Sequence, residues 1–408
     1  MNRLIIESGG QMNKLLYTEE GRITAVDFFE KREVLRKGQI YKGIVRKLQR
    51  GMNSALVDLG EGKTGFLQER EIARSLKNGE EVLVQVKREA VEDKYPKLTR
   101  EIRLLGVSLI LFPLSKGLKR SKKLPPEFEV PELSRKGETL GILLRSACLQ
   151  LPRERIGSEY RKMQAVWEKI WKEFSRRYSP GLLWEEEPIL SFLFDRGISH
   201  LEELISNDEA LIKRLSESLQ ERVSVAAVRS LATEYVFDYC GLEKDFHALF
   251  EKKVRAEGQV SILIEHTQAF TVIDVNSGAA FSHVDFERNV LEANKNAARE
   301  IVRQMRLRDV GGVVLIDFID MKSAESKEEL LRYFREQVRE QGLSDTSILS
   351  MTELCILQLL RKKEKDSLMN RATEVCACCG GSGRTLRRVF AEDEEQRERI
   401  MREKHLWK

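Results

Sequence analysis

The chain of 408 residues is 33% charged and 41% hydrophobic, which is typical of a folded, water-soluble protein and too long for one ordinary core. Its 70 basic and 65 acidic residues leave a net charge of +5, so nucleic-acid contacts would have to come from local basic patches. No apolar stretch approaches the ~18 residues of a membrane span, and an acid follows the N-terminus too closely for a secretory leader. Six cysteines, three of them crowded together, exclude a disulfide framework, so we expect a cytoplasmic protein.

The first quarter of the chain has the pattern of short strands. Residues 1 to about 36 alternate apolar and polar side chains between glycine turns, which predicts a β-meander. A second β-rich unit runs from Gly38 to about Leu105, and its strands mix basic and aromatic residues. This pattern favours a five-stranded OB-fold barrel, a fold that binds single strands by stacking bases on aromatic side chains in a basic groove.

The middle of the chain contains predicted helices, and residues 183 to 252 are predicted to be a mixed helical segment. Ile198 to Leu219 is the clearest helical part of residues 183 to 252, and Ser158 to Tyr178 forms a second helix. Four side chains at helical spacing predict the core-facing side of that second helix: Trp167, Ile170, Trp171 and Phe174.

Arg145 and Ser146 follow an apolar strand that begins at Leu140. A guanidinium beside a hydroxyl can hold a phosphate by paired hydrogen bonds, which makes the two residues a candidate anion site. The alternative is an arginine that simply pairs with a nearby acid, and the sequence leaves both interpretations open.

From Val254 to about Ala372 the pattern alternates strand, helix, strand and helix, which predicts a layered α/β domain. The first helix should cover Asp285 to Arg308 and stop at the glycine pair that follows. Ser326-Lys-Glu-Glu329 has the form of a capping box for the next helix, and Gly342 should end it.

Two strands of this region carry acids. Asp274 and Asn276 lie in Phe270-Thr-Val-Ile-Asp-Val-Asn-Ser-Gly278, and Asp317 lies in the strand after the first helix. Residues two apart on a strand project to the same face, so these three side chains can converge. A single acid at a strand end more often caps a helix or closes a turn. Two acids on neighbouring apolar strands, one with an amide beside it, point instead to a hard cation such as Mg²⁺, because unpaired buried carboxylates are costly.

Cys376 and Cys379 have the spacing of half a zinc site. The same spacing occurs in thioredoxin-like redox pairs, but no βαβ context follows it here. Cys378 adds a third thiol, so the sequence allows either a zinc ion shared between two chains or a self-contained site. A short charged helix from Glu392 to Lys404 is predicted beyond it.

The acid-bearing segments, Asp-Val-Asn-Ser-Gly and Gly-Gly-Val-Val-Leu-Ile-Asp-Phe-Ile-Asp-Met, resemble the catalytic segments of the ribonuclease E/G family. The resemblance implies that Asp274 and Asp317 hold magnesium and that Asn276 orients one of them, while the role of Asp320 is less defined. It also implies that the cysteine pair shares zinc between two chains of a homodimer. The stretch around Met351 and Arg361 resembles the family's following helix, which lines the RNA path. The resemblance implies RNA contacts at Phe66, Tyr41, Arg361 and Lys362. It also implies a sensor of the RNA 5′ phosphate at Arg145, Ser146 and Gly117.

The resemblance further implies a multidomain α+β organisation. The implied parts are a ribonuclease-H-like domain split over 1–36 and 183–252, an inserted OB-fold barrel at 37–105, a 5′-end sensor region at 106–182, a DNase-I-like catalytic domain at 253–372, a zinc link at 373–384 and a charged helix at 385–408.

The implied function is a magnesium-dependent endoribonuclease. It would cut single-stranded, A/U-rich RNA in rRNA or tRNA processing or in mRNA decay, leave 5′-phosphate and 3′-hydroxyl ends, and respond to a 5′ monophosphate. Two rivals are a non-catalytic RNA-binding protein that uses the barrel alone and an oxidoreductase that uses the cysteine pair. The intact acids argue against the first, and the lack of any feature that would activate Cys376 argues against the second.

Overall fold

The computed structural model divides the chain into two compact units, residues 1–368 and 369–408. The fold below is that of the first unit; of the second, only the end of a short helix, α8 (Leu368–Ala372), and a few residues after it are described. The structure describes residues 1–31, 35–49, 54–68, 76–90, 94–129, 133, 140–219, 222–267, 269–278, 286–343, 345–363, 365–374 and 376.

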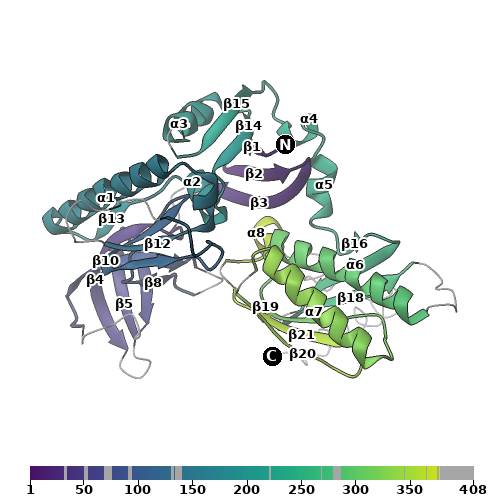
Figure 1. Cartoon of the computed structure of the whole chain (residues 1–408). Helices are drawn as coiled ribbons and strands as arrows, with labels where there is room; N and C mark the ends of the chain where they lie inside the picture. The colour runs from purple at the N-terminus through teal and green to yellow at the C-terminus, as the bar shows by residue number, and fades with distance from the viewer. Residues whose placement is uncertain are drawn as a thin grey trace, which may run out of the picture. The chain divides into compact units, whose positions relative to one another are not determined.

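A five-stranded sheet joins the start of the chain to a segment about two hundred residues later (Figure 1). Its strand order is β15-β14-β1-β2-β3, and β1 pairs in parallel with β14, Arg3 lying opposite Glu203. The three N-terminal strands confirm the predicted β-meander. The strands are β1 (Arg3–Ser8), β2 (Met12–Glu19), β3 (Arg22–Glu30), β14 (His200–Ser206) and β15 (Ser224–Ser230).

The predicted helix from Ile198 to Leu219 is wrong in its first half. His200–Ser206 is the strand β14, and only the later part is helical, as α3 (Glu209–Leu219). Pairing with strands on both sides decided the conformation of this apolar run, which local pattern alone cannot distinguish from a helix. The other helices of this segment are α2 (Pro188–Arg196), α4 (Val236–Tyr239) and α5 (Glu243–Ala248).

A closed barrel follows the meander, as the sequence predicts. Its sheet order is β13-β4-β5-β6-β8-β7, and the additional pairing of β4 with β7 closes a five-stranded ring. Gly65 allows β6 to pack closely on β8, since a Cβ there would lie 2.6 Å from Leu98 Cδ1. The strands are β4 (Ile40–Gln49), β5 (Ser54–Gly60), β6 (Lys63–Gln68), β7 (Glu81–Arg88), β8 (Lys97–Thr99) and β13 (Gly181–Trp184).

A four-stranded sheet of order β11-β12-β10-β9 packs with the long helix α1 (Arg153–Arg176). Ile170 of this helix is buried as predicted, but Trp171 is 48% exposed and is not part of the core. Its ring instead stacks beside the aromatic rings on the same helix face. The remaining elements are β9 (Leu104–Leu105), β10 (Leu109–Lys116), β11 (Leu118–Arg120), β12 (Leu140–Leu144) and the 3-10 helix η3 (Ser146–Gln150).

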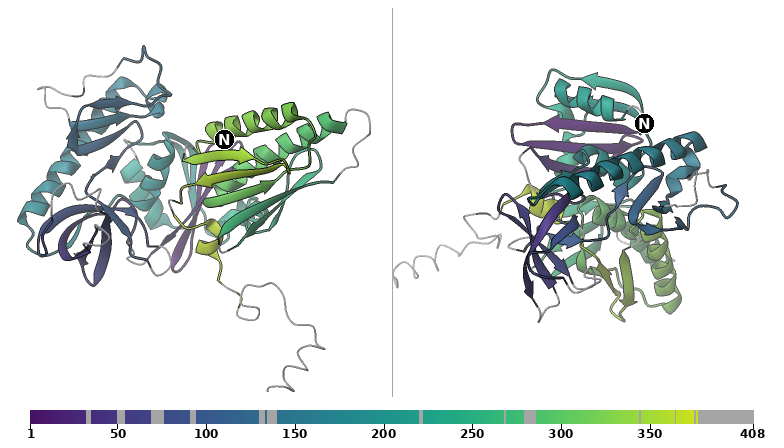
Figure 2. Two further views of the ribbon diagram at one scale, coloured as in Figure 1. Left: turned by 90° about the horizontal axis from the view of Figure 1, so that it is seen from below. Right: turned by 90° about the vertical axis from the view of Figure 1, so that its left-hand side faces the viewer.

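The last sheet is six-stranded and mixed, with order β16-β17-β18-β19-β21-β20. Helices α6 (Phe286–Leu307) and α7 (Ala324–Glu340) pack against each other and cover one face of it (Figures 1 and 2). The strands are β16 (Lys253–Arg255), β17 (Val260–His266), β18 (Phe270–Ser277), β19 (Gly312–Asp317), β20 (Thr346–Met351) and β21 (Ile356–Arg361).

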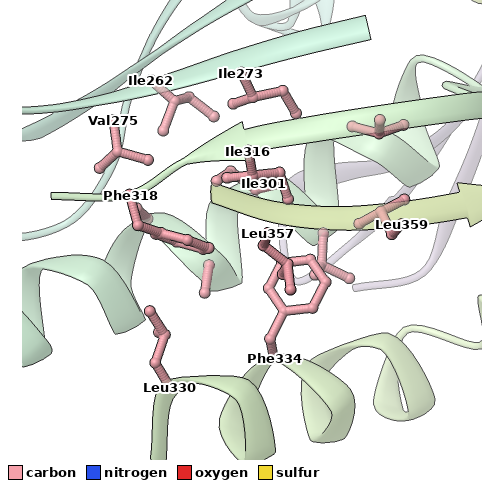
Figure 3. Close-up of a cluster of buried hydrophobic side chains, with 14 of the residues drawn as sticks. Ile262, Ile273, Val275, Ile301, Ile316, Phe318, Leu330, Phe334, Leu357 and Leu359 are labelled. Atoms are coloured by element: carbon pink, nitrogen blue, oxygen red, sulfur yellow. The ribbon is translucent and has the colours of Figure 1, made fainter. Parts of the chain in front are cut away.

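The core of this domain lies between the sheet and its two helices (Figure 3). Ile273 and Ile316 point from the central strands toward the helices, and Phe334 of α7 points back at them. The alternate residues of β18 and β19 face the other way and are half-buried or exposed. The acid-bearing strands are therefore buried on one face only, not on both as their apolar sequence suggests.

Two local predictions in this domain need correction. Helix α7 begins at Ala324, because the side chain of Ser323 caps it by accepting a hydrogen bond from the Ser326 amide at 3.3 Å. The predicted capping box at Ser326 is thus one turn too late. The stretch from Met351 to Arg361 is not a helix but the end of β20 and all of β21, which pair antiparallel.

Within the described ranges, no helix is long and apolar enough to cross a bilayer.

Removing the Phe334 ring should destabilise the domain strongly. Phe334 is fully buried, so Phe334→Ala should lower the free energy of unfolding by about 3–5 kcal/mol through lost burial and a cavity. Leu349→Ala is a matched control, because Leu349 is 60% exposed and should change stability by less than about 0.5 kcal/mol. Urea titration followed by circular dichroism measures both, and equal losses would contradict this account of the core.

Candidate active site

The parallel pairing of β18 and β19 places Asp274 directly opposite Asp317. Both side chains lie on the sheet face away from the helices, because the buried residues of each strand occupy the alternate positions. Asn276 shares that face and donates from Nδ2 to Asp274 Oδ2 at 2.6 Å. The structure thus brings together the three side chains that the sequence predicted to converge.

Asp274 and Asp317 are two like charges with no positively charged side chain beside them among the described residues. Desolvation, followed by the charges of Asp274 and Asp320, raises the pKa of Asp317 above its usual range. In the part of the chain that the structure describes, no lysine or arginine lies within ion-pair distance of any of these three acids. Asp317 and Asp320 are exposed, so the prediction that the acids are buried in the sheet interior is wrong. The repulsion between the acids raises the pKa of Asp317 further than desolvation alone does.

The carboxylates of the site provide the oxygen ligands that a magnesium ion prefers. Among the described residues, no group of three or more histidine, cysteine, aspartate or glutamate side chains is close enough to hold a metal ion. Asp274 and Asp317 therefore offer a two-carboxylate site with oxygen ligands only. Mg²⁺ usually binds proteins through one or two carboxylates and keeps waters or substrate phosphates as its other ligands. The residues present fit magnesium in that mode.

Two residues that the sequence analysis missed fix the segment between β19 and α7. Asn294 of α6 donates to the Ile319 carbonyl at 2.9 Å and accepts from the Ile319 amide at 3.0 Å. Glu287 accepts from the Ser323 amide at 2.9 Å, and that bond contributes most to its lowered pKa. Asn294 could have been found, because it is a polar residue on the largely apolar, buried stripe of a helix.

The barrel presents a row of side chains suited to nucleic acid. Leu56 and Phe66 face each other across β5 and β6, and both are half-buried on the outer side of the wall. Lys47 lies beside Leu56 on β4, and Lys97 lies beside Phe66 on β8; both lysines are exposed. An aromatic ring between two cations is the arrangement on which a single strand can stack.

Tyr41 and Arg361 are placed differently from the prediction. Tyr41 is only 3% exposed inside the barrel core and donates its hydroxyl to Gln39 Oε1 at 3.0 Å, so it cannot stack on RNA. Arg361 donates from Nη1 to the carbonyls of Met305 and Val310, at 3.0 and 2.7 Å, and so closes the end of α6. The guanidinium of Arg361 therefore forms hydrogen bonds within the protein, whereas the prediction assigned it to RNA. Lys362 is exposed, and its contact with RNA stays a prediction.

The predicted phosphate-sensor residues do not all come together. Arg145 donates to the carbonyls of Gly106 at 2.7 Å, Asp195 at 3.0 Å and Phe194, which is neither of the alternatives left open by the sequence. Burial of this guanidinium lowers its pKa. Ser146 is exposed at the start of η3.

Gly117 lies beside the start of β12, because Leu118 pairs with Ile142 in parallel. Arg145 follows the end of that strand, about 13 Å away by strand geometry. Gly106, which the sequence analysis did not consider, is the glycine that contacts Arg145.

Cys376 is exposed. The partners predicted for it, Cys378 and Cys379, lie outside the described residues, as does the predicted helix from Glu392 to Lys404. The shared zinc site therefore stays a prediction.

Comparison with known proteins identifies the family. The model of the Ribonuclease E/G family matches residues 103–364, more than half of the chain and including both acids. Ribonuclease E of a Nostoc species is 28% identical over 86% of this chain and 54% of its own length. Ribonuclease E of a Synechocystis species is 29% identical over 85% of this chain and 55% of its own length.

Ribonuclease G of Haemophilus influenzae is 25% identical over 85% of this chain and 76% of its own length. The chain thus spans about half the length of the ribonuclease E proteins it matches and about three quarters of that ribonuclease G. The extent of the family match and the residues it contains give the same answer: the chain belongs to the ribonuclease E/G family.

Proposed function

We propose that this protein is a magnesium-dependent endoribonuclease that hydrolyses single-stranded RNA and leaves 5′-phosphate and 3′-hydroxyl ends. The observation that carries the proposal is the pair of unneutralised carboxylates, Asp274 and Asp317, on the open face of the sheet. The names of the relatives, ribonuclease E and ribonuclease G, support the same class of reaction.

The roles of the individual side chains follow from their contacts. Asp274 and Asp317 would hold Mg²⁺, which when bound supplies a Lewis acid for the phosphate and a more acidic water. Asn276 ties down one oxygen of Asp274 and leaves the other oxygen free to act as a ligand. Asn294 and Glu287 hold the turn that follows Asp317 and act as positioning residues.

The surroundings of the carboxylates favour an extended, single-stranded substrate. Phe270 and Leu360 lie on the same sheet face, in one row across Val313, and are 44% and 48% exposed. This row is four residues along the strands from the acids, about 13 Å away by strand geometry. Exposed apolar side chains on the face that carries the acids offer unpaired bases a surface for stacking, which the paired bases of a duplex cannot use. We propose an A/U-rich preference only by family resemblance.

We propose stimulation by a 5′ monophosphate only by family resemblance. The three carbonyl acceptors of Arg145 and the distance of Gly117 from it give no support to a sensor built from those residues.

The remaining rival is an RNA-binding protein that uses the barrel without catalysis. It leaves the two adjacent acids without a role, although their mutual repulsion is destabilising in the absence of a cation.

Removing either carboxylate should stop cleavage. Asp274→Asn and Asp317→Asn should each slow single-turnover cleavage of single-stranded RNA by at least about a hundredfold, because groups that stabilise developing charge are worth ~10²–10³ in rate. RNA affinity should change little, since it depends on the barrel and basic surface. Asp345→Asn is the control, an acid of the same domain that lies 3.8 Å from Arg361. Near wild-type cleavage by either variant would refute the magnesium assignment.

Neutralising Asp317 should also stabilise the metal-free protein. Its raised pKa means that the folded state binds the proton more tightly than the unfolded state, so stability is lost as pH rises through that pKa. At pH 7 with a chelator, Asp317→Asn should therefore raise the free energy of unfolding by a few tenths of a kcal/mol, up to ~1. Asp345→Asn should not raise it. Adding Mg²⁺ should raise the Tm of the wild type more than that of the Asp317 variant.

The barrel platform should contribute to binding rather than to chemistry. Phe66→Ala should weaken binding of single-stranded RNA by about 1–3 kcal/mol, the usual value of one stacked base. Tyr41→Phe is the matched control, because that side chain is buried and its loss of a hydroxyl should leave RNA affinity unchanged. Fluorescence anisotropy at fixed salt measures both, and an equal effect of the two changes would rule out Phe66 as a contact.

A further inference from the structure

The strand β16 lies at the edge of the sheet that carries the acids, two strands away from β18 (Figure 1). Lys253 of β16 lies in one row across the sheet with Asp274, and Arg255 lies in another such row with Asn276. The residues of β17 between them are Leu263 in the first row and Ser261 in the second. Each row therefore joins a positively charged residue of the edge strand to a residue of the candidate site.

Both cations are on the face of the sheet that carries the acids. Val254, which lies between them in the sequence, packs against the hydrophobic core on the helix side. Because side chains alternate along a strand, Lys253 and Arg255 project from the opposite, open face. Neighbouring strands are about 4.8 Å apart, so the Cα atom of Lys253 is about 10 Å from that of Asp274. At this separation the lysine does not pair with the acid but can reach an anion bound beside it.

Neither cation forms an ion pair within the protein. Lys253 and Arg255 are exposed, and in the described part of the chain neither has a carboxylate within ion-pair distance. The preceding residue, Lys252, differs because it pairs with Glu265 at 3.0 Å. Positive charges that no protein group neutralises remain available to a polyanion that binds on the same face.

The turn that joins β16 to β17 holds the edge strand in place. The Gln259 carbonyl accepts from the Gly278 amide, directly after the end of β18, at 2.9 Å. In the same turn, Glu257 pairs with Arg299 of α6 at 2.8 Å. Gln259 has a φ of 62°, a left-handed conformation that costs energy for a residue other than glycine. The edge strand is thus fixed both to the acid-bearing strand and to the helix behind it.

We propose that Lys253 and Arg255 bind the phosphodiester backbone of single-stranded RNA on the β16 side of the two carboxylates. Because each cation lies in a row with a site residue, the phosphates that they contact are neighbours of the one that is hydrolysed. The proposal rests on the proposed function for the identity of this ligand. Backbone contacts of this kind hold a strand in position without reading its sequence.

An alternative role for the two charges is protection of an exposed edge. Charged side chains, lysine above all, keep an edge strand from pairing with another chain. In that case, removing them should leave RNA affinity and its dependence on salt unchanged. The two roles therefore differ in a quantity that can be measured.

The first measurement is the affinity of the full chain for a single-stranded RNA oligonucleotide at several salt concentrations. A chelator is present, so cleavage plays no part and the result does not depend on nuclease activity. The variants are Lys253→Gln and Arg255→Gln, alone and together. Lys252→Gln is the matched control, because it makes the same change of charge at a lysine that already has a partner.

Each single variant should weaken binding at low salt by about two- to tenfold. The slope of log affinity against log salt should fall by about 0.7 for each, the value of one phosphate contact on a single strand. Lys252→Gln should keep the slope of the wild type, and so should Arg255→Lys, which retains the charge. Damage to the fold would not produce this pattern, and circular dichroism checks that each variant is folded.

The second measurement locates the contact along the RNA. Single-turnover cleavage with Mg²⁺ is compared for an RNA with one cleavage site and for the same RNA with a neutral methylphosphonate in place of one phosphate near that site. If Arg255 contacts that phosphate, Arg255→Gln and the methylphosphonate should each slow cleavage at subsaturating protein. Combining the two changes should then add little, because both remove the same interaction.

Three results would overturn the proposal. The first is a wild type that does not bind the oligonucleotide, and the second is a folded double variant whose salt slope equals that of the wild type. The third is an equal loss of slope in Lys252→Gln, which would show only a general effect of charge. A wild type that binds RNA but does not cleave it would refute the proposed function, while the salt slopes would still decide the roles of Lys253 and Arg255.

Discussion

The parallel register of β18 and β19 is the constraint on which the rest of the site depends. Because side chains alternate between the faces of a sheet, a slip of one residue would send Asp274 and Asp317 to opposite sides. The register is held by the apolar face of α6, the crossover helix, packed against the alternate residues of both strands. In the folded chain, burial of that face outweighs the repulsion between the two adjacent carboxylates.

Much of the domain formed by β16 to β21, α6 and α7 could be predicted, because these elements follow from residue patterns within short stretches of sequence. The stripe of α6 and the shared face of Asp274 and Asn276 follow from helical and strand periods alone. The strands β14 and β21 could not be predicted, since short apolar runs become strands or helices according to which partners they find. Likewise, the alternation of apolar and polar residues in β18 does not predict whether the face of the strand that carries Asp274 will be covered by other elements.

The site shows the same division. The sequence indicated which acids converge. It did not indicate that Asp317 is exposed and Asp274 half-buried, or that Asn294 fixes the neighbouring turn. Tyr41 and Arg361 were assigned to RNA by their place in a motif, and packing used them for the barrel core and the end of a helix. The contacts of Arg145 depend on carbonyls from two distant segments, at Gly106 and at Phe194–Asp195, which no local pattern can reveal.

The pairing of β1 with β14 has a consequence for synthesis. The edge of β1 that β14 later covers leaves the ribosome about two hundred residues before its partner. At ~5–20 residues per second, the apolar strands β1 to β3 wait roughly ten to forty seconds with that edge unpaired. The barrel and the α1 region are made during this interval and can fold on their own strand pairings. Among the described sheets, the one that contains β1 is therefore completed only after the barrel and the sheet of β9 to β12.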